Sequence, residues 1–77
     1  MDNQAKVTEI ISRVTGNAVT IDPEESLFDS GVLDSFALTD VIGELEKEFS
    51  IKVPDADLNP RKFNSVSRIV SYVEAHL

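Results

Sequence analysis

The sequence predicts an all-α fold, a small bundle of three main helices and one short helix. Three segments carry apolar residues at the three- and four-residue spacing of amphipathic helices, and 77 residues suffice for one small domain. Cysteine is absent, so a domain of this size lacks disulfides and thiolate zinc sites and depends on helix packing. We therefore expect residues 1–77 to form a single domain around a modest apolar core.

The first helix is expected from about Asn3 to Thr15. Gly16-Asn17 is a plausible stop signal after it. Its apolar stripe, at positions i, i+3, i+4 and i+7, consists of Val7, Ile10, Ile11 and Val14.

Residues 17–34 form a long connection, and loops of that length are uncommon in compact domains and usually functional. Asp22-Pro23-Glu24-Glu25 is expected to be a turn or the first turn of a short helix, and a second turn is expected at Asp29-Ser30-Gly31. The apolar residues that can anchor this connection on the bundle are Val19, Ile21, Leu27, Phe28, Val32 and Leu33.

The second helix is expected from about Ser35 to Phe49. Its predicted buried face consists of Leu38, Val41, Ile42, Leu45 and Phe49. Asp40, Glu44 and Glu48 lie four residues apart and share an exposed face, although like charges at this spacing slightly destabilise a helix. This acidic face is either simply solvated or a docking site for basic partner surfaces.

After this helix, Ile51-Lys52-Val53-Pro54 is extended by its alternation, and residues 55–60 contain turn residues and one helical turn. Ser65 or Asn64 then caps the last helix. The apolar residues of this helix are Val66, Ile69, Val70, Tyr72, Val73 and Leu77.

Charge is concentrated in the middle of the chain. The net charge is −7, and the segment from Asp22 to Asp57 holds 11 acidic and two basic residues, a net charge of −9. Nucleic acid is therefore not an expected partner, because phosphate binding needs Lys and Arg. No apolar run approaches a transmembrane length and Met1-Asp2-Asn3-Gln4 does not start a signal peptide, so we expect a cytoplasmic monomer without membrane insertion.

Ser35 stands where the long connection becomes the second helix, within Gly31-Val32-Leu33-Asp34-Ser35-Phe36. A serine at this position is ordinarily a helix cap, but Asp34 can cap the helix and leave the serine hydroxyl available. An exposed hydroxyl at a helix N-terminus suits a phosphate-linked group, because the backbone N–H groups and the helix dipole favour an anion there.

The chain resembles the acyl and peptidyl carrier proteins in Leu27-Phe28-Asp29-Ser30-Gly31-Val32-Leu33-Asp34-Ser35-Phe36 and over nearly its whole length. The resemblance implies a right-handed four-helix bundle and 4′-phosphopantetheine attached to Ser35, with Asp34 and Phe36 beside it. It implies modification by a phosphopantetheinyl transferase from coenzyme A with magnesium. The protein would not be an enzyme but would carry an acyl or aminoacyl thioester.

Its expected partners are that transferase, a loading ligase, and a downstream transferase or synthase with basic docking surfaces that meet Asp40, Glu44, Glu48 and Phe36. Phe36 is either such a contact or part of the core, whereas Phe28 and Phe49 are expected in the core. The pathway is fatty-acid, polyketide, nonribosomal-peptide, or specialised lipid or cell-wall biosynthesis.

Two positions distinguish the chain from fatty-acid carriers, in which an acid usually stands two places after the serine and consecutive acids end the second helix. Here Ala37 takes the first position, and Lys47 follows Glu46. Leu-Asp-Ser-Phe and the slightly long segment from Val53 to Val70 are closer to specialised stand-alone carriers such as D-alanyl carrier proteins.

Three other functions are open to test. One is an unmodified helical protein-interaction module with the same fold. Another is calcium binding, but the spacing of the loop acids does not match an EF-hand and predicts no metal site beyond weak, non-specific divalent binding. The third is catalysis, for which the single histidine, His76, is poorly placed near the C-terminus.

Overall fold

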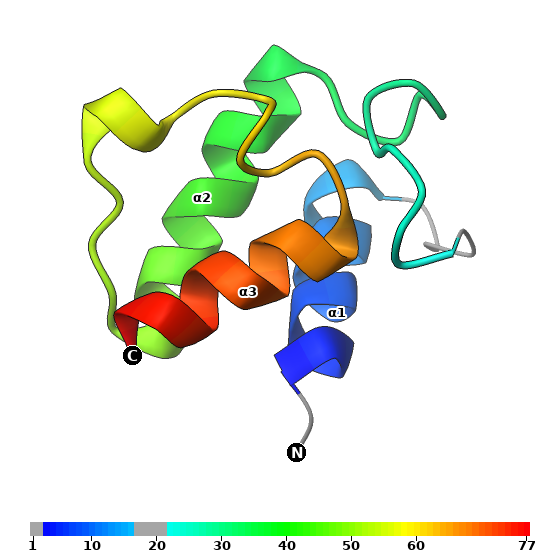
Figure 1. Ribbon diagram of the computed structural model, residues 1–77. Helices are drawn as coiled ribbons and strands as arrows, with labels where there is room; N and C mark the ends of the chain where they lie inside the picture. Colours follow the sequence, from blue (N-terminus) through cyan, green and yellow to red (C-terminus); the bar gives the residue numbers. More distant parts are fainter. Residues whose placement is uncertain (1–2, 17–21) are drawn as a thin grey trace.

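The computed structural model describes residues 3–16 and 22–77, which form three α-helices and one turn of 3₁₀ helix (Figure 1). Helix α1 spans Asn3–Thr15, α2 spans Ser35–Phe49 and α3 spans Val66–His76. Helix α1 packs against both α2 and α3, and no strand occurs in these two described ranges. The all-α prediction is therefore confirmed.

The helices bury their predicted stripes in one core. Partly buried Val14, Phe28, Phe49 and Val70 pack against its edge, whereas Leu77, expected to add apolar bulk, lies exposed just after α3. The buried apolar side chains are Val7, Ile10, Ile11, Leu27, Leu33, Leu38, Val41, Ile42, Leu45, Ile51, Val53, Phe63, Val66, Ile69 and Val73.

The predicted fourth helix is not confirmed as a helix of the bundle. At its expected place a 3₁₀ turn, η1, spans Asp55–Asp57. Pro54 precedes it without a side-chain cap, and Pro60 follows shortly after, which disfavours helical backbone at Asn59. A single turn bounded in this way is too short to nucleate an α-helix.

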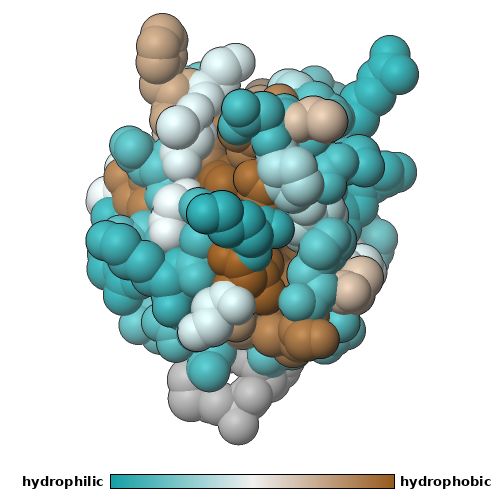
Figure 2. Space-filling view, turned by 90° about the vertical axis from the view of Figure 1, so that its left-hand side faces the viewer, coloured by the Kyte–Doolittle hydropathy of each residue, from teal (hydrophilic) through white to brown (hydrophobic). Residues whose placement is uncertain are grey.

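The segment that leads from α2 to η1 runs along the left-hand side of Figure 1. Ile51 and Val53 are buried while Lys52 and Pro54 are exposed, which confirms the predicted alternation. Figure 2 shows this side of the molecule, where apolar surface lies between polar side chains.

Helix α1 ends at the predicted stop. Gly16 has a φ of +75° and donates its N–H to the carbonyl of Ser12 at 2.9 Å, a conformation that glycine adopts without steric cost. The neighbouring Asn17 and the loop anchors Val19 and Ile21 lie outside the described residues.

Residues 22–33, which we call the strap, cross from α1 to α2 and are fixed on the start of α3. The backbone N–H of Leu27 donates to the carbonyl of Asn64 at 2.7 Å, and the Ser26 hydroxyl donates to the Asn64 side chain at 2.7 Å. The N–H of Ser67 donates to the carbonyl of Pro23 at 3.0 Å. Buried Leu27 and Leu33 complete the anchoring, as the sequence predicts.

Candidate functional site

Ser35 is the first residue of α2, and the strap delivers the chain to it. Gly31, with a φ of +83°, turns the strap back so that the N–H of Leu33 donates to the carbonyl of Leu27 at 2.9 Å. Leu27 and Leu33 are both buried, whereas Ser35 is exposed. The Ser35 side chain is thus accessible, and buried residues on its N-terminal side hold the backbone that leads to it.

Asp34, not Ser35, caps α2. Its carboxylate Oδ1 accepts the N–H of Ala37 at 2.8 Å, and its carbonyl accepts the N–H of Leu38 at 2.9 Å. Among the described residues, none makes a hydrogen bond to the Ser35 hydroxyl. The prediction that Asp34 can take over the cap is confirmed, and the Ser35 hydroxyl is left without a structural task.

The start of α2 also offers backbone donors. The N–H groups of Ser35 and Phe36 lie in the first turn of α2, where backbone N–H groups have no acceptor within the helix. With the helix dipole they favour a phosphate here by roughly 0.3–1 kcal/mol, and the nearby Asp34 carboxylate opposes this. The exposed hydroxyl and the unpaired donors therefore fit a phosphodiester at Ser35, with a modest electrostatic preference.

Phe36 projects into solvent next to Ser35. Its side chain is 87% exposed, the highest value among the large apolar residues described. It is therefore not part of the core, which removes one of the two interpretations open at the sequence level. Its contact with a partner remains a prediction.

The acids of α2 are less free than the sequence suggests. Glu44 is half-buried and its carboxylate lies 3.3 Å from the Arg13 guanidinium. Glu48 lies 3.8 Å from the Lys6 amine, which in turn sits 5.6 Å from the centre of the Phe49 ring. Two of the three acids thus face α1. Asp40 is exposed and has no ion-pair partner among the described residues.

Glu46 has a structural task that spacing alone does not indicate. Its carboxylate accepts the N–H of Val53 at 2.9 Å and so joins α2 to the segment that follows it. The chain turns between the two at Ser50, whose φ is +55°. Glu46 is therefore engaged within the fold, apart from the stripe of Asp40, Glu44 and Glu48.

Tyr72 holds η1 on α3. Its hydroxyl donates to the Asp57 carboxylate at 2.7 Å, and the Lys62 amine lies 3.0 Å from the same carboxylate. The pKa of Asp57 is lowered below 3.8, mainly by the hydrogen bond from Tyr72 and next by the one from Lys62. The pKa of Tyr72 is raised to about 12, mainly by burial and next by its hydrogen bond to Asp57.

Ring contacts extend this pair. The Tyr72 ring lies 4.9 Å from that of buried Phe63 and stacks on His76 at 4.1 Å. The imidazole of His76 also hydrogen-bonds the carbonyl of Tyr72 at 2.8 Å. His76 is therefore engaged in a structural contact at the end of α3.

Two observations bear on other functions. Within residues 3–16 and 22–77, no three histidine or acidic side chains converge as a metal site. None of the helices described is long and apolar enough to cross a bilayer.

The chain matches known carriers over nearly its whole length. The family described as "Phosphopantetheine attachment site" matches residues 5–73. A D-alanyl carrier protein of Streptococcus sanguinis is 40% identical over 73 residues, which are 95% of this chain and 92% of the relative. One of Streptococcus pyogenes is 39% identical over 74 residues (96% and 94%), and one of Leuconostoc mesenteroides 28% over 75 residues (97% and 96%). The chain therefore belongs to the phosphopantetheine attachment family, as a carrier protein whose cofactor is covalently attached 4′-phosphopantetheine.

Proposed function

We propose that the Ser35 hydroxyl is the attachment point. The observation that carries this proposal is the cap of α2: Asp34 accepts the N–H of Ala37 at 2.8 Å, so the serine at the helix start is free to react. Ser35 is exposed, and the strap fixes its backbone. When bound, the cofactor supplies a terminal thiol that carries the cargo as a thioester, which a chain without cysteine cannot do by itself.

We propose D-alanine as the cargo. Ala37 and Lys47 set the chain apart from the fatty-acid pattern, and the relatives described above are D-alanyl carrier proteins. The partners are then a phosphopantetheinyl transferase, a ligase that activates D-alanine, and a downstream acceptor enzyme. The protein itself is a cytoplasmic, monomeric, single-domain carrier without catalytic activity of its own.

Intact mass tests the attachment point. The chain is incubated with coenzyme A, magnesium and a broad-specificity phosphopantetheinyl transferase, in parallel with Ser35→Ala and with Ser30→Ala as a matched serine control. We expect one phosphopantetheine mass increment on the native chain and on Ser30→Ala, and none on Ser35→Ala. An increment on Ser35→Ala would place the attachment elsewhere. No increment on any folded chain would favour an unmodified protein-interaction module.

Loading tests the cargo. The modified chain is offered to the ligase that loads the Streptococcus sanguinis carrier, with ATP and either D-alanine, L-alanine or a fatty acid. We expect a D-alanyl mass increment that hydroxylamine removes, because a thioester is labile to that nucleophile. A modified chain that a fatty-acyl ligase loads, and the D-alanine ligase does not, would contradict this cargo while leaving Ser35 as the attachment point.

A further inference from the structure

Asn64 stands shortly before α3 but does not cap that helix. Ser65 is the cap, since its hydroxyl accepts the N–H of Arg68 at 3.2 Å, so the alternative in which Asn64 caps α3 is wrong. The residues on both sides of Asn64, Phe63 and Ser65, are buried. Asn64 therefore has a well-fixed backbone and a side chain that α3 does not need.

The side chain of Asn64 is directed at the strap. Its Oδ1 accepts the Ser26 hydroxyl at 2.7 Å, and its carbonyl accepts the N–H of Leu27 at 2.7 Å. An open hollow of about 220 Å³ lies beside these bonds, and it is lined by Ser26, Phe28, Asp29, Pro60, Arg61 and Asn64. At this point the hydrogen bonds of Asn64, rather than close packing, hold the strap to the segment that precedes α3.

The strap between this contact and α2 is a hydrogen-bonded turn. The Ser26 hydroxyl, which donates to Asn64, also accepts the N–H of Asp29 at 3.0 Å. The carbonyl of Leu27 accepts the N–H of Leu33 at 2.9 Å, and Leu33 directly precedes the cap of α2. Two hydrogen-bonded steps therefore lead from Asn64 to the residue before that cap.

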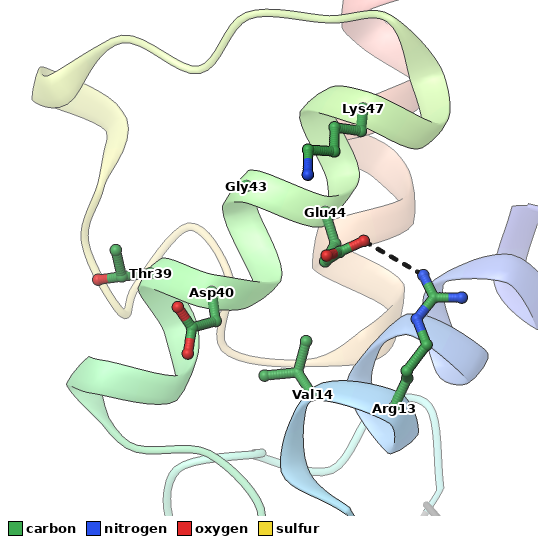
Figure 3. A pocket seen from close by; sticks show the side chains of 7 residues that line it. All are labelled: Arg13, Val14, Thr39, Asp40, Gly43, Glu44 and Lys47. Atoms are coloured by element: carbon green, nitrogen blue, oxygen red, sulfur yellow. Dashed lines mark hydrogen bonds and ion pairs between the residues drawn. The ribbon is translucent and has the colours of Figure 1, made fainter.

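The start of α2 depends on the strap more than the rest of the helix does. The first buried side chain of α2 is Leu38, whereas Ser35 and Phe36 are exposed. Further along, buried residues fix the helix on the core, and Glu44 pairs with Arg13 of α1 at 3.3 Å (Figure 3). The contacts that hold the cap of α2 therefore have the larger effect on the position of Ser35.

We propose that Asn64 is a positioning residue for phosphopantetheine transfer, and that it acts on Ser35 through Ser26 and the turn of the strap. The proposal rests on the proposed attachment at Ser35 and requires no contact between Asn64 and an enzyme. Loss of the Asn64 side chain leaves its backbone bond to Leu27, so the strap stays attached while its turn can shift. Because a nucleophile misplaced by about 1 Å can react about a hundredfold more slowly, the effect falls on kcat.

Kinetics of transfer by the broad-specificity transferase, with the full chain, test this role. In Asn64→Ala we expect kcat and kcat/KM to fall together by about tenfold with KM nearly unchanged, since only the placement of the hydroxyl changes. Ser26→Ala removes the other half of the same hydrogen bond and should give the same fall, and the double variant should be no slower than either single one. Tyr72→Phe is the matched control, because it removes a different hydrogen bond to α3, that with Asp57, and should leave kcat unchanged.

Amide hydrogen exchange distinguishes positioning from a general loss of stability. In Asn64→Ala the amides of Leu33 and Ala37, which bond the strap and the cap of α2, should exchange faster than in the native chain. The amide of Ile69, which bonds the carbonyl of Ser65 within α3, should keep its native rate. Equal acceleration at all three amides would show that Asn64 only stabilises the fold.

The variants give the results that would overturn the proposal. A folded Asn64→Ala or Ser26→Ala with native kcat would refute the positioning role, and so would an equal fall of kcat in Tyr72→Phe. Should Asn64→Ala fail to fold, Ser26→Ala decides alone, because it leaves the segment before α3 unaltered. Absence of transfer to the native chain would instead refute the attachment at Ser35.

Discussion

At the scale of single residues, the site depends on a division of tasks between neighbours. Asp34 caps the helix with a hydrogen bond of 2.8 Å, a contribution of about 0.5–2 kcal/mol to stability. Ser35, the attachment residue that we propose, keeps an exposed side chain, and Phe36 lies in solvent. One residue type occurs here in opposite environments, since Phe63 is fully buried and Phe36 is 87% exposed.

The two phenylalanines give a paired prediction. Phe63→Ala should reduce the free energy of unfolding by about 3–5 kcal/mol, because it leaves a cavity in the core. Phe36→Ala should change it by less than about 0.5 kcal/mol and should weaken reactions with partner enzymes. Urea unfolding and transferase kinetics measure both effects. A large loss of stability in Phe36→Ala with unaltered kinetics would make Phe36 a structural residue.

At the scale of elements, the one-turn helix η1 depends on contacts with α3. The Asp57 carboxylate accepts a hydrogen bond from Tyr72 and pairs with the Lys62 amine. The buried ring of Phe63 packs against the Tyr72 ring. The lowered pKa of Asp57 means that this contribution to stability is present above pH 3.8 and is lost as pH falls through the lowered value. At alkaline pH the contribution is lost between pH 10.0 and about 12, as Tyr72 ionises.

Because Tyr72 is the only tyrosine and tryptophan is absent, near-ultraviolet absorbance titrates it directly. We expect a midpoint near the raised pKa of about 12 in the folded protein. Asp57→Asn should lower the midpoint toward 10.0 without reaching it. Burial is the larger cause of the raised pKa of Tyr72, and it persists when the hydrogen bond to the carboxylate is lost. Circular dichroism at each pH confirms that the fold persists. A native midpoint at 10.0 would contradict the hydrogen bond to Asp57 and the partial burial of Tyr72.

At the scale of the whole molecule, the surface is strongly acidic but locally compensated. The segment from Asp22 to Asp57 carries a net charge of −9, yet Lys6 and Arg13 on α1 pair with two of the acids of α2. Exposed ion pairs of this kind contribute little to stability, about 0–1 kcal/mol. They leave Asp40 as the uncompensated acid among Asp40, Glu44 and Glu48, and it is the acid of this stripe that we expect partners to contact.

The whole-molecule charge predicts that kcat/KM for transfer by the phosphopantetheinyl transferase falls as salt rises. Screening shortens the reach of exposed charges to about 10 Å at 0.1 M salt. Asp40→Asn should flatten the salt dependence more than Glu74→Gln, which removes the same charge from α3. Equal slopes for the two variants would show that net charge alone steers the encounter. Kinetics that are independent of salt would remove the electrostatic explanation altogether.

Helical periodicity accounts for much of what the sequence predicts here. It places α1, α2 and α3, most of the core, and Ser35 at a helix start, because these features depend on local spacing. It misses Phe63, an isolated apolar residue in a polar segment, and the bond from Tyr72 to Asp57. It also overstates the exposure of Glu44, since only the packing of α1 brings Arg13 to it. Each miss involves a contact between segments distant in the chain.

The strap has a consequence for the timing of synthesis. Its bonds join Ser26 to Asn64 and Pro23 to Ser67, partners separated by about forty positions in a chain of 77 residues. On the ribosome, residues 22–33 cannot find these partners until residues 64–67 have emerged. The segment that presents Ser35 therefore settles only after the start of α3 has been made, although it precedes α3 by some thirty positions. A transferase that requires the settled segment would ignore nascent chains that still lack the start of α3.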